Sequence, residues 1–173
     1  MKAPIFVRAD GGKFEISANV LQRMLDFVQD EPKRAEAGGV LLGRHIVEST
    51  DVVVDEITLP MAGDRRSRRR FFRGKAGHQE VVDRLWQESN GTCVYLGGWH
   101  SHPEADPTPS DVDFEDWKRR LREDVFDSDD LYFVIVGTEI LRAWIADKKT
   151  GPCTFLGACR HGGSYDVADE DTR

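Results

Sequence analysis

Apolar residues recur at helical spacing in three segments of the chain. Ser17, a favoured N-cap residue, precedes the first segment, which predicts an amphipathic helix over residues 17–30. The same spacing predicts helices over residues 78–89 and 110–124, and Asn90-Gly91 breaks the pattern after the second. The apolar positions are Val20, Leu21, Met24, Leu25 and Val28 in the first helix, Val81, Val82, Leu85 and Trp86 in the second, and Phe114, Trp117 and Leu121 in the third.

Short apolar and β-branched runs between these helices predict strands. The run of residues 38–46 (GGVLLGRHI) is bounded by glycines and is typical of a buried strand, whereas residues 51–60 (DVVVDEITLP) are β-branched and end in proline. Further strands are predicted over residues 69–73, 93–100, 131–137 and 141–146, the last two as a hairpin. The order helix, strands, helix, strand, helix, strands predicts an α/β fold with a single mixed β-sheet flanked by helices.

Length and composition are those of a globular protein. The chain has 173 residues, 39% of them hydrophobic, and one domain over residues 1–160 can bury about 70% of its unfolded surface. Residues 161–173 are polar and predict a disordered tail. No apolar run reaches the ~18 residues of a membrane span, and no apolar signal-peptide core is present. We therefore expect a cytoplasmic protein, in which the three cysteines (Cys93, Cys153, Cys159), in no metal-binding spacing, are free thiols.

The segment Gly98-Trp99-His100-Ser101-His102-Pro103, with Ser110 and Asp113 after it, carries the candidate chemistry. Residues i and i+2 of an extended chain point to the same face, so His100 and His102 can direct their imidazoles to one point. A turn rich in proline can bring Asp113 back to that point as a third ligand. Two histidines and one carboxylate, with a fourth position left to water, form the ligand set of a hydrolytic zinc site rather than a structural one.

Each part of this pattern also has a purely structural interpretation. Ser110 and Asp113 match a capping box, in which a serine N-cap and an acidic residue at N3 exchange hydrogen bonds, although Glu or Gln is more usual at N3. Either histidine alone is compatible with an ordinary strand position. The combination favours a metal site, and both roles of Ser110 are compatible, because its backbone can cap the helix while its hydroxyl faces the site.

The spacing His-x-His-x7-Ser-x2-Asp resembles the signature of the JAMM metallopeptidases, also known as the MPN-plus or JAB domain. Those enzymes use an upstream glutamate before a glycine-rich strand, and Glu36-Ala37-Gly38-Gly39-Val40-Leu41-Leu42-Gly43 fits that pattern. The resemblance covers about residues 17–146 and implies a cytidine-deaminase-like core. Taken alone, Glu36 is compatible with a solvated carboxylate at a helix end; together with the histidine motif, the resemblance implies a catalytic role.

The resemblance implies metal-assisted amide hydrolysis. A Zn²⁺ ion held by His100, His102 and Asp113 would lower the pKa of its bound water to around 7. Glu36 would take a proton from that water and return it to the leaving amine. The hydroxyl of Ser110 would donate to the oxyanion of the tetrahedral intermediate, a contribution of about 3–4 kcal/mol. The other histidines, expected at the surface or behind the ligands, are His45, His78 and His161.

The residues that flank the motif narrow the resemblance. Gly98 to Glu104, Pro107-Thr108-Pro109 and Trp117 are similar to bacterial JAB proteases encoded beside E1/E2-like proteins, and in particular to the deconjugating peptidase of CBASS antiphage systems. There an E1–E2-like protein joins the C-terminus of a CD-NTase (a cyclic-oligonucleotide synthase) to target amines, and the JAMM protein cleaves that bond. The implied partners are a CD-NTase or its conjugates and the E1–E2-like protein.

Two alternatives to this function stay open. One is a JAMM peptidase that processes the precursor of a ubiquitin-like or sulfur-carrier protein. The other is a non-catalytic MPN scaffold; family members of that kind lack the metal ligands, whereas this chain keeps His100, His102 and Asp113.

Six arginines between Arg65 and Arg73 form a basic run in an otherwise acidic chain. The run is compatible with a solvated loop and strand edge. It is equally compatible with a surface that binds the extended, acidic C-terminal tail of a substrate, added as a strand beside the sheet edge. Nucleic-acid binding is a third interpretation, which the net charge of −7 disfavours.

Overall fold

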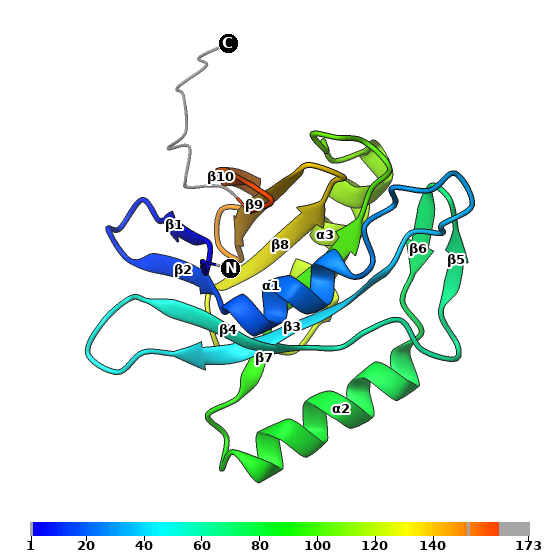
Figure 1. The fold of residues 1–173 in the computed structure, drawn as a ribbon. Coiled ribbons are helices and arrows are strands. Elements are labelled where there is room, and N and C mark those ends of the chain that lie inside the picture. The colour runs from blue at the N-terminus through cyan, green and yellow to red at the C-terminus, as the bar shows by residue number, and fades with distance from the viewer. Residues whose placement is uncertain (1, 152, 163–173) are drawn as a thin grey trace.

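The structure, a computed structural model, describes residues 2–151 and 153–162 and is built around an eight-stranded mixed sheet (Figure 1). In spatial order its strands are β1 (Ile5–Val7), β2 (Lys13–Ile16), β4 (Val52–Ile57), β3 (Gly38–His45), β7 (Val94–Ser101), β8 (Asp130–Val136), β9 (Ile140–Asp147) and β10 (Cys153–Arg160). The pairs β2–β4 and β7–β8 are parallel, and the other neighbours are antiparallel. Two short strands, β5 (Arg65–Ser67) and β6 (Arg70–Phe72), form a separate hairpin beside the sheet.

Helices cover both faces of the sheet, which confirms the predicted fold class. They are α1 (Ala18–Leu25), α2 (Lys75–Glu88) and α3 (Asp111–Glu123). On one face, α1 buries Val20, Leu21 and Met24 against the strands. On the opposite face, Trp117 of α3 stacks on Phe133 of β8 with ring centroids 4.6 Å apart. Two apolar clusters, one on each face, therefore hold the three layers together.

The helices depart from the predicted boundaries and faces in specific ways. Ser17 is the N-cap of α1, as predicted, but the helix ends at Leu25 rather than at residue 30. Phe114 of α3 is partly exposed, and Trp86 of α2 is 52% exposed, so neither belongs to an inner face. The spacing of apolar residues marks a helix correctly but overstates how much of that helix the sheet covers.

All the predicted strands are present in the structure. The structure also contains four strands that were not predicted, β1, β2, β5 and β10. Of these, β1 and β2 have only three and four residues, and β5 consists of Arg65, Arg66 and Ser67. Strand β10 contains a register shift between Phe155 and Gly157. Short length, polar composition and a bulge each remove the two-residue alternation from which a strand is predicted.

Strand β7 lies in the middle of the sheet between β3 and β8, and its pairing with β3 is interrupted by a bulge at Gly97. Gly97 has a φ of +142°, and a Cβ atom there would lie 1.8 Å from the carbonyl oxygen of Tyr132. Only glycine fits this position. Because the bulge adds a residue, Leu96 and Trp99 both pack into the cluster on the α1 face. His100 is thereby directed to the α3 face.

A buried hydrogen-bonded group holds the root of the β5–β6 hairpin. The carboxylate of Asp64 accepts a hydrogen bond from the backbone N–H of Gly74 (2.7 Å) and lies 3.0 Å from Nε2 of His78. The other ring nitrogen of His78 lies 2.6 Å from Oγ1 of Thr58, just after β4. His78 is 2% exposed, so of its two expected places, at the surface or behind the ligands, the surface is wrong. It joins α2 to the sheet and to the hairpin.

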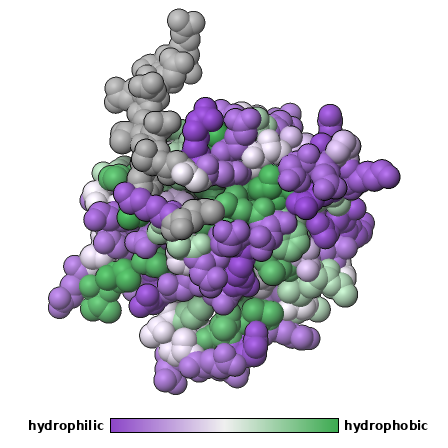
Figure 2. Space-filling model, viewed as in Figure 1, coloured by the Kyte–Doolittle hydropathy of each residue, from purple (hydrophilic) through white to green (hydrophobic). Residues whose placement is uncertain are grey.

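The face of the molecule seen in Figure 2 carries both hydrophilic and hydrophobic side chains. Figure 2 shows hydrophilic side chains over the side on which β5 and β6 lie in Figure 1. None of the helices in residues 2–151 and 153–162 is long and apolar enough to cross a bilayer. Of the tail predicted to be disordered, residues 161–173, all but residues 161 and 162 lie outside the described residues.

We expect His78 to stabilise the fold in its neutral form. Burial lowers the pKa of His78 below its ordinary value of 6.5, so the unfolded chain binds the proton more readily than the folded one. The contribution is present above pH 6.5 and is lost as the pH falls through the folded-state pKa. His78→Leu should lower the free energy of unfolding at pH 7.5 by about 1–3 kcal/mol.

Urea unfolding from pH 7.5 to pH 5 measures this contribution. The difference between wild type and His78→Leu should shrink as the pH falls, and the exposed His45→Leu is the control with little effect at pH 7.5. A difference that stays constant over this range contradicts the assignment.

Candidate active site

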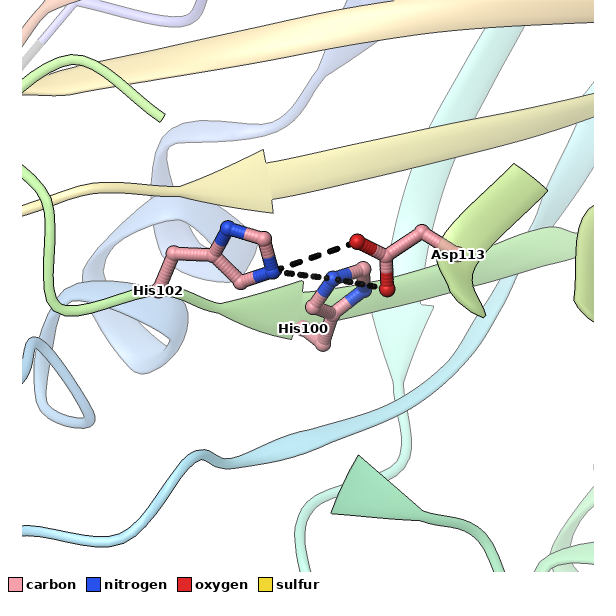
Figure 3. A group of neighbouring side chains, drawn as sticks. All are labelled: His100, His102 and Asp113. Carbon is pink, nitrogen blue, oxygen red and sulfur yellow. Dashed lines mark hydrogen bonds and ion pairs between the residues drawn. The ribbon is translucent and has the colours of Figure 1, made fainter. Parts of the chain in front are cut away.

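His100 near the end of β7, His102 just beyond it and Asp113 in the first turn of α3 converge on one point (Figure 3). The Nε2 atoms of the two histidines are 3.0 Å apart. Oδ1 of Asp113 lies 3.2 Å from Nε2 of His100, and Oδ2 lies 3.5 Å from Nε2 of His102. The structure thus brings together the three residues that the sequence analysis grouped, and their role as ligands stays a prediction.

A capping box at the start of α3 positions Asp113. Oδ2 of Asp113 accepts hydrogen bonds from the backbone N–H and the hydroxyl of Ser110, both at 2.7 Å. Oγ of Ser110 accepts the backbone N–H of Asp113 at 3.3 Å. The structural interpretation of the pair is therefore confirmed, and it is compatible with the predicted metal site, because the same carboxylate faces both histidines. The role of Ser110 as an oxyanion donor stays a prediction.

The site is strongly polarised around Asp113. Burial alone would raise the pKa of this carboxyl group, but hydrogen bonds from His100, His102 and Ser110 outweigh burial and hold the pKa well below its usual range. Burial alone would lower the pKa of His102, and the hydrogen bond and charge of Asp113 outweigh that effect and raise it. Asp113 is therefore always a carboxylate near neutral pH, as a metal ligand must be.

Glu36 lies immediately before β3 and is 4% exposed, so it is not a solvated carboxylate. Its backbone N–H donates to the carbonyl oxygen of Ser67 (2.8 Å), and Nε of Arg66 donates to its carbonyl oxygen (2.6 Å). Burial raises the pKa of Glu36 to about 8, with His102 acting in the opposite direction and Asp113 in the same direction as burial. A buried carboxyl group that titrates near neutral pH is typical of a proton carrier.

The donor set fits a zinc ion. Its ligand atoms lie within 4.8 Å of one another. The histidine nitrogens and carboxylate oxygens are separated by 3.0, 3.2 and 3.5 Å. Four ligands at about 2.0–2.2 Å around one tetrahedral ion lie about 3.3–3.6 Å apart. Imidazole nitrogen and carboxylate oxygen are both ordinary zinc ligands. His100, His102 and Asp113 therefore match the ion in chemistry and in spacing.

Glu104 is a functional candidate that the sequence analysis missed. Its Oε2 lies 3.3 Å from Nδ1 of His102. A carboxylate on the far nitrogen of a ligand histidine orients the ring and directs the other nitrogen to the metal. The sequence signal for this role is a carboxylate two residues after His102. The sequence does not show the turn that brings this carboxylate back to the imidazole, so the contact could not be predicted from it.

A pocket of about 660 Å³ opens from the ligand atoms. Glu36 and Ser110 both line it, and Gly98 of β7 lies in its wall without a side chain. The β5–β6 hairpin contributes Arg65, Arg69, Arg70, Phe71, Phe72 and Arg73, and α3 contributes Val112, Asp116, Trp117, Arg119 and Arg120. Arginines of both elements thus surround the candidate ligand group.

The hairpin approaches the sheet closely at the start of β3. A Cβ atom on Gly38 would lie 2.6 Å from the ring of Phe71, so the hairpin reaches this position only because residue 38 is glycine. Gly38 pairs with His100 in the β3–β7 register. The glycine motif after Glu36 therefore brings the basic hairpin beside the ligand strand.

Other candidate residues take no part in the site. His45 is exposed, as expected, and His161 is half-buried. Cys93, Cys153 and Cys159 are free thiols, as predicted.

Comparisons with known proteins show what this chain is similar to. The family model for prokaryotic homologues of the JAB domain matches residues 17–147. A CD-NTase/cGAS isopeptidase of Pseudomonas aeruginosa is 39% identical over 103 residues, which span 60% of this chain and 64% of that protein. Proteins of the same name from Vibrio cholerae (34% identity, 78% of this chain and 81% of the relative) and Escherichia coli (31%, 86% and 90%) are also similar.

A solved structure supports the fold independently. The solution structure of a protein from Desulfitobacterium hafniense is 25% identical and has a TM-score of 0.52. The match covers 81% of this chain and 87% of that protein.

We expect the purified protein to contain about one zinc ion per chain. His100→Ala/His102→Ala should remove it, because one carboxylate alone cannot hold the ion. Elemental analysis after gel filtration measures the content, with His45→Ala as the matched control that keeps its zinc. A folded wild-type protein that binds no zinc when zinc is supplied contradicts the metal site.

Proposed function

The chain belongs to the family of prokaryotic homologues of the JAB domain, and we propose that it is a zinc-dependent isopeptidase that releases conjugated CD-NTases. It would cleave the amide bond that follows the C-terminus of a CD-NTase joined to another protein, as part of an antiphage (CBASS) system. The observation that carries the proposal is the buried Glu36 beside the His100–His102–Asp113 group. The names of the relatives support the substrate class.

Each residue of the site has a distinct part in hydrolysis. His100, His102 and Asp113 would hold the zinc ion. When bound, zinc supplies Lewis acidity, which polarises a carbonyl group and makes water more acidic. Glu104 keeps the imidazole of His102 oriented.

Glu36 is the proton carrier of the reaction. Its pKa of about 8 lets the side chain both take up and release a proton near neutral pH, as a general base that later acts as a general acid requires. Its carboxyl group lines the same pocket as the ligands. It would take the proton of the attacking water and return it to the leaving amine.

Ser110 is placed to stabilise charge on the substrate. Its hydroxyl lines the pocket and donates to Asp113 in the resting protein. Donation to the oxyanion of the tetrahedral intermediate requires that the hydroxyl rotate away from Asp113, whose Oδ2 keeps the backbone N–H of Ser110 as a donor. The capping box therefore survives this change.

The groove between the β5–β6 hairpin and α3 suits an extended substrate tail. Within the described part of the chain, β6 pairs only with β5, so its other edge has backbone groups free to bond an added strand. Residues Arg70 to Arg73 along this edge line the pocket. A tail that pairs with β6 would place its last residues at the ligand group.

The arginine run divides into two kinds of side chain. Arg66 and Arg68 donate to backbone carbonyl oxygens of residues 31–36 and hold the hairpin. Arg65, Arg69 and Arg70 line the pocket, and among the described residues they form no ion pair. Uncompensated positive charge beside the groove favours an acidic tail. The unpaired arginines beside the groove support a binding role for the run over the interpretation as a purely solvated loop.

Glu36→Gln should abolish cleavage while zinc stays bound. The amide keeps the shape of the side chain but cannot accept a proton, so we expect a rate loss of about 10²–10⁴-fold. The substrate is a CD-NTase with a test protein fused to its C-terminus, and wild type should cut directly after the CD-NTase tail.

The exposed Glu31→Gln, in the loop that leads to Glu36, is the matched control with wild-type activity. A ubiquitin-like or sulfur-carrier precursor serves as a second substrate. Cleavage of that precursor without cleavage of the CD-NTase fusion assigns the enzyme to precursor processing instead.

Arg69→Glu/Arg70→Glu should raise the KM for the full-length conjugate by about ten-fold with little change in kcat. The reversed charges repel an acidic tail without touching the ligands. Lys149→Glu/Arg160→Glu, two exposed reversals away from the pocket, is the matched control. Unchanged kinetics of the Arg69/Arg70 variant rule out tail recognition through the run.

A further inference from the structure

Gln29 is a buried amide whose position neither the metal site nor the apolar core explains. It follows α1, which ends at Leu25, and is 1% exposed. Its Nε2 donates to the carbonyl oxygens of Arg34 (3.0 Å) and Arg68 (2.9 Å), and its Oε1 accepts from Oγ of Ser101 (3.2 Å). Both N–H donors and the carbonyl acceptor of the amide are therefore in use.

Ser101 lies between the two ligand histidines and is fully buried. Because side chains alternate along a strand, its hydroxyl points away from the ligand group. This hydroxyl accepts the backbone N–H of Ala37 at 2.9 Å, and the backbone N–H of Ser101 donates to the carbonyl oxygen of Ala37 at 2.8 Å. The residue between the ligands is thus bonded to the residue that follows Glu36.

Gln29 links the hairpin to Ser101 and, through Ser101, to Ala37. Arg68 lies in the turn between β5 and β6, so its bond to Gln29 fixes the tip of the hairpin. Arg66 and Ser67, in β5, bond the backbone of Glu36. The hairpin tip, Glu36 and the ligand strand are therefore held to one another through one amide and one hydroxyl.

We infer that Gln29 is a positioning residue that couples the substrate-binding hairpin to the catalytic base. Through Arg68 it keeps the hairpin closed over the groove, and through Ser101 it keeps Glu36 at a set place relative to the ligands. This inference rests on the proposed function for the roles of the hairpin and of Glu36, but the coupling itself is a property of the fold.

A packing role alone does not account for this arrangement. An apolar side chain of similar length would fill the same volume without the cost of burying an amide. It would leave the carbonyl oxygens of Arg34 and Arg68 without this donor. Loss of the bonds should open the hairpin locally rather than unfold the sheet, because neither apolar cluster includes Gln29.

Three variants test the coupling. Gln29→Met keeps the size and removes all three hydrogen bonds. Ser101→Ala removes the hydroxyl that bonds the backbone N–H of Ala37 and Oε1 of Gln29. It leaves the bonds of Gln29 to Arg34 and Arg68 and the backbone bond from Ser101 to Ala37. Gln22→Leu, an exposed glutamine of α1, is the matched control. Each variant is compared with wild type, both with zinc bound. Three quantities are measured: the rate of trypsin cleavage at the arginine run, the rate of amide exchange at Ala37, and the kinetics of conjugate hydrolysis.

The two variants should differ in a way that a general loss of stability does not produce. Gln29→Met should raise the rate of trypsin cleavage at residues 65–70 about ten-fold, since cleavage follows the open population, and should raise KM and lower kcat. Ser101→Ala should speed exchange of the Ala37 amide and lower kcat, with KM and trypsin cleavage near wild type. Gln22→Leu should match wild type throughout.

The coupling is overturned if Gln29→Met is cleaved by trypsin, and exchanges its Ala37 amide, at the same rates as wild type, whatever its activity. Equal loss of protection at every amide of either variant would overturn it as well, because that pattern reports global destabilisation. If the protease and exchange effects are present but wild type cleaves no conjugate, the coupling stands and the proposed function fails. If Gln29→Met does not fold, Ser101→Ala decides: unchanged Ala37 exchange and kcat overturn the inference.

Discussion

The alternation of side chains at the end of β7 is the constraint on which the rest of the site depends. His100 and His102 point to the α3 face, and Ser101 between them points to the interior. One three-residue segment therefore supplies two candidate metal ligands and the hydroxyl that anchors the start of β3. The bulge at Gly97 sets this phase, because an unbulged strand would place Trp99 and His100 on exchanged faces.

Hydrogen bonds and ion pairs orient the side chains of the candidate ligand group. The capping box of α3 orients Asp113, and Glu104 contacts His102. Asp113 stays ionised because hydrogen bonds outweigh burial, whereas Glu36, without comparable donors to its carboxyl group, has its pKa raised by burial. The surroundings thus shift the pKa values of two carboxyl groups in one pocket in opposite directions, which suits the proposed roles of Asp113 as a ligand and Glu36 as a proton carrier.

The β5–β6 hairpin lines one side of the candidate site with arginines. It belongs to no large sheet, and buried polar groups hold it at both ends. At its root, Asp64 and His78 close the loop onto Thr58, and at its tip Gln29 binds the carbonyl oxygen of Arg68. Hydrogen bonds of this kind fix position more specifically than apolar contacts, since each partner must meet its own donor or acceptor.

Glu36 was placed in the site through the resemblance to the JAMM enzymes. By itself, the sequence determined most of the element types, the mixed α/β class, and the grouping of His100, His102, Asp113 and Ser110. These follow from short spacings: a two-residue strand period, a helical period, and a motif that a single turn can close. The burial of His78, the partners of Gln29 and the place of the hairpin were decided only by the tertiary structure. Ser101 and Gln29 are 72 positions apart, and His78 and Thr58 are 20 apart. No local pattern specifies such pairs, because they are chosen when the packed layers bring buried donors and acceptors together, and an unpaired one is costly.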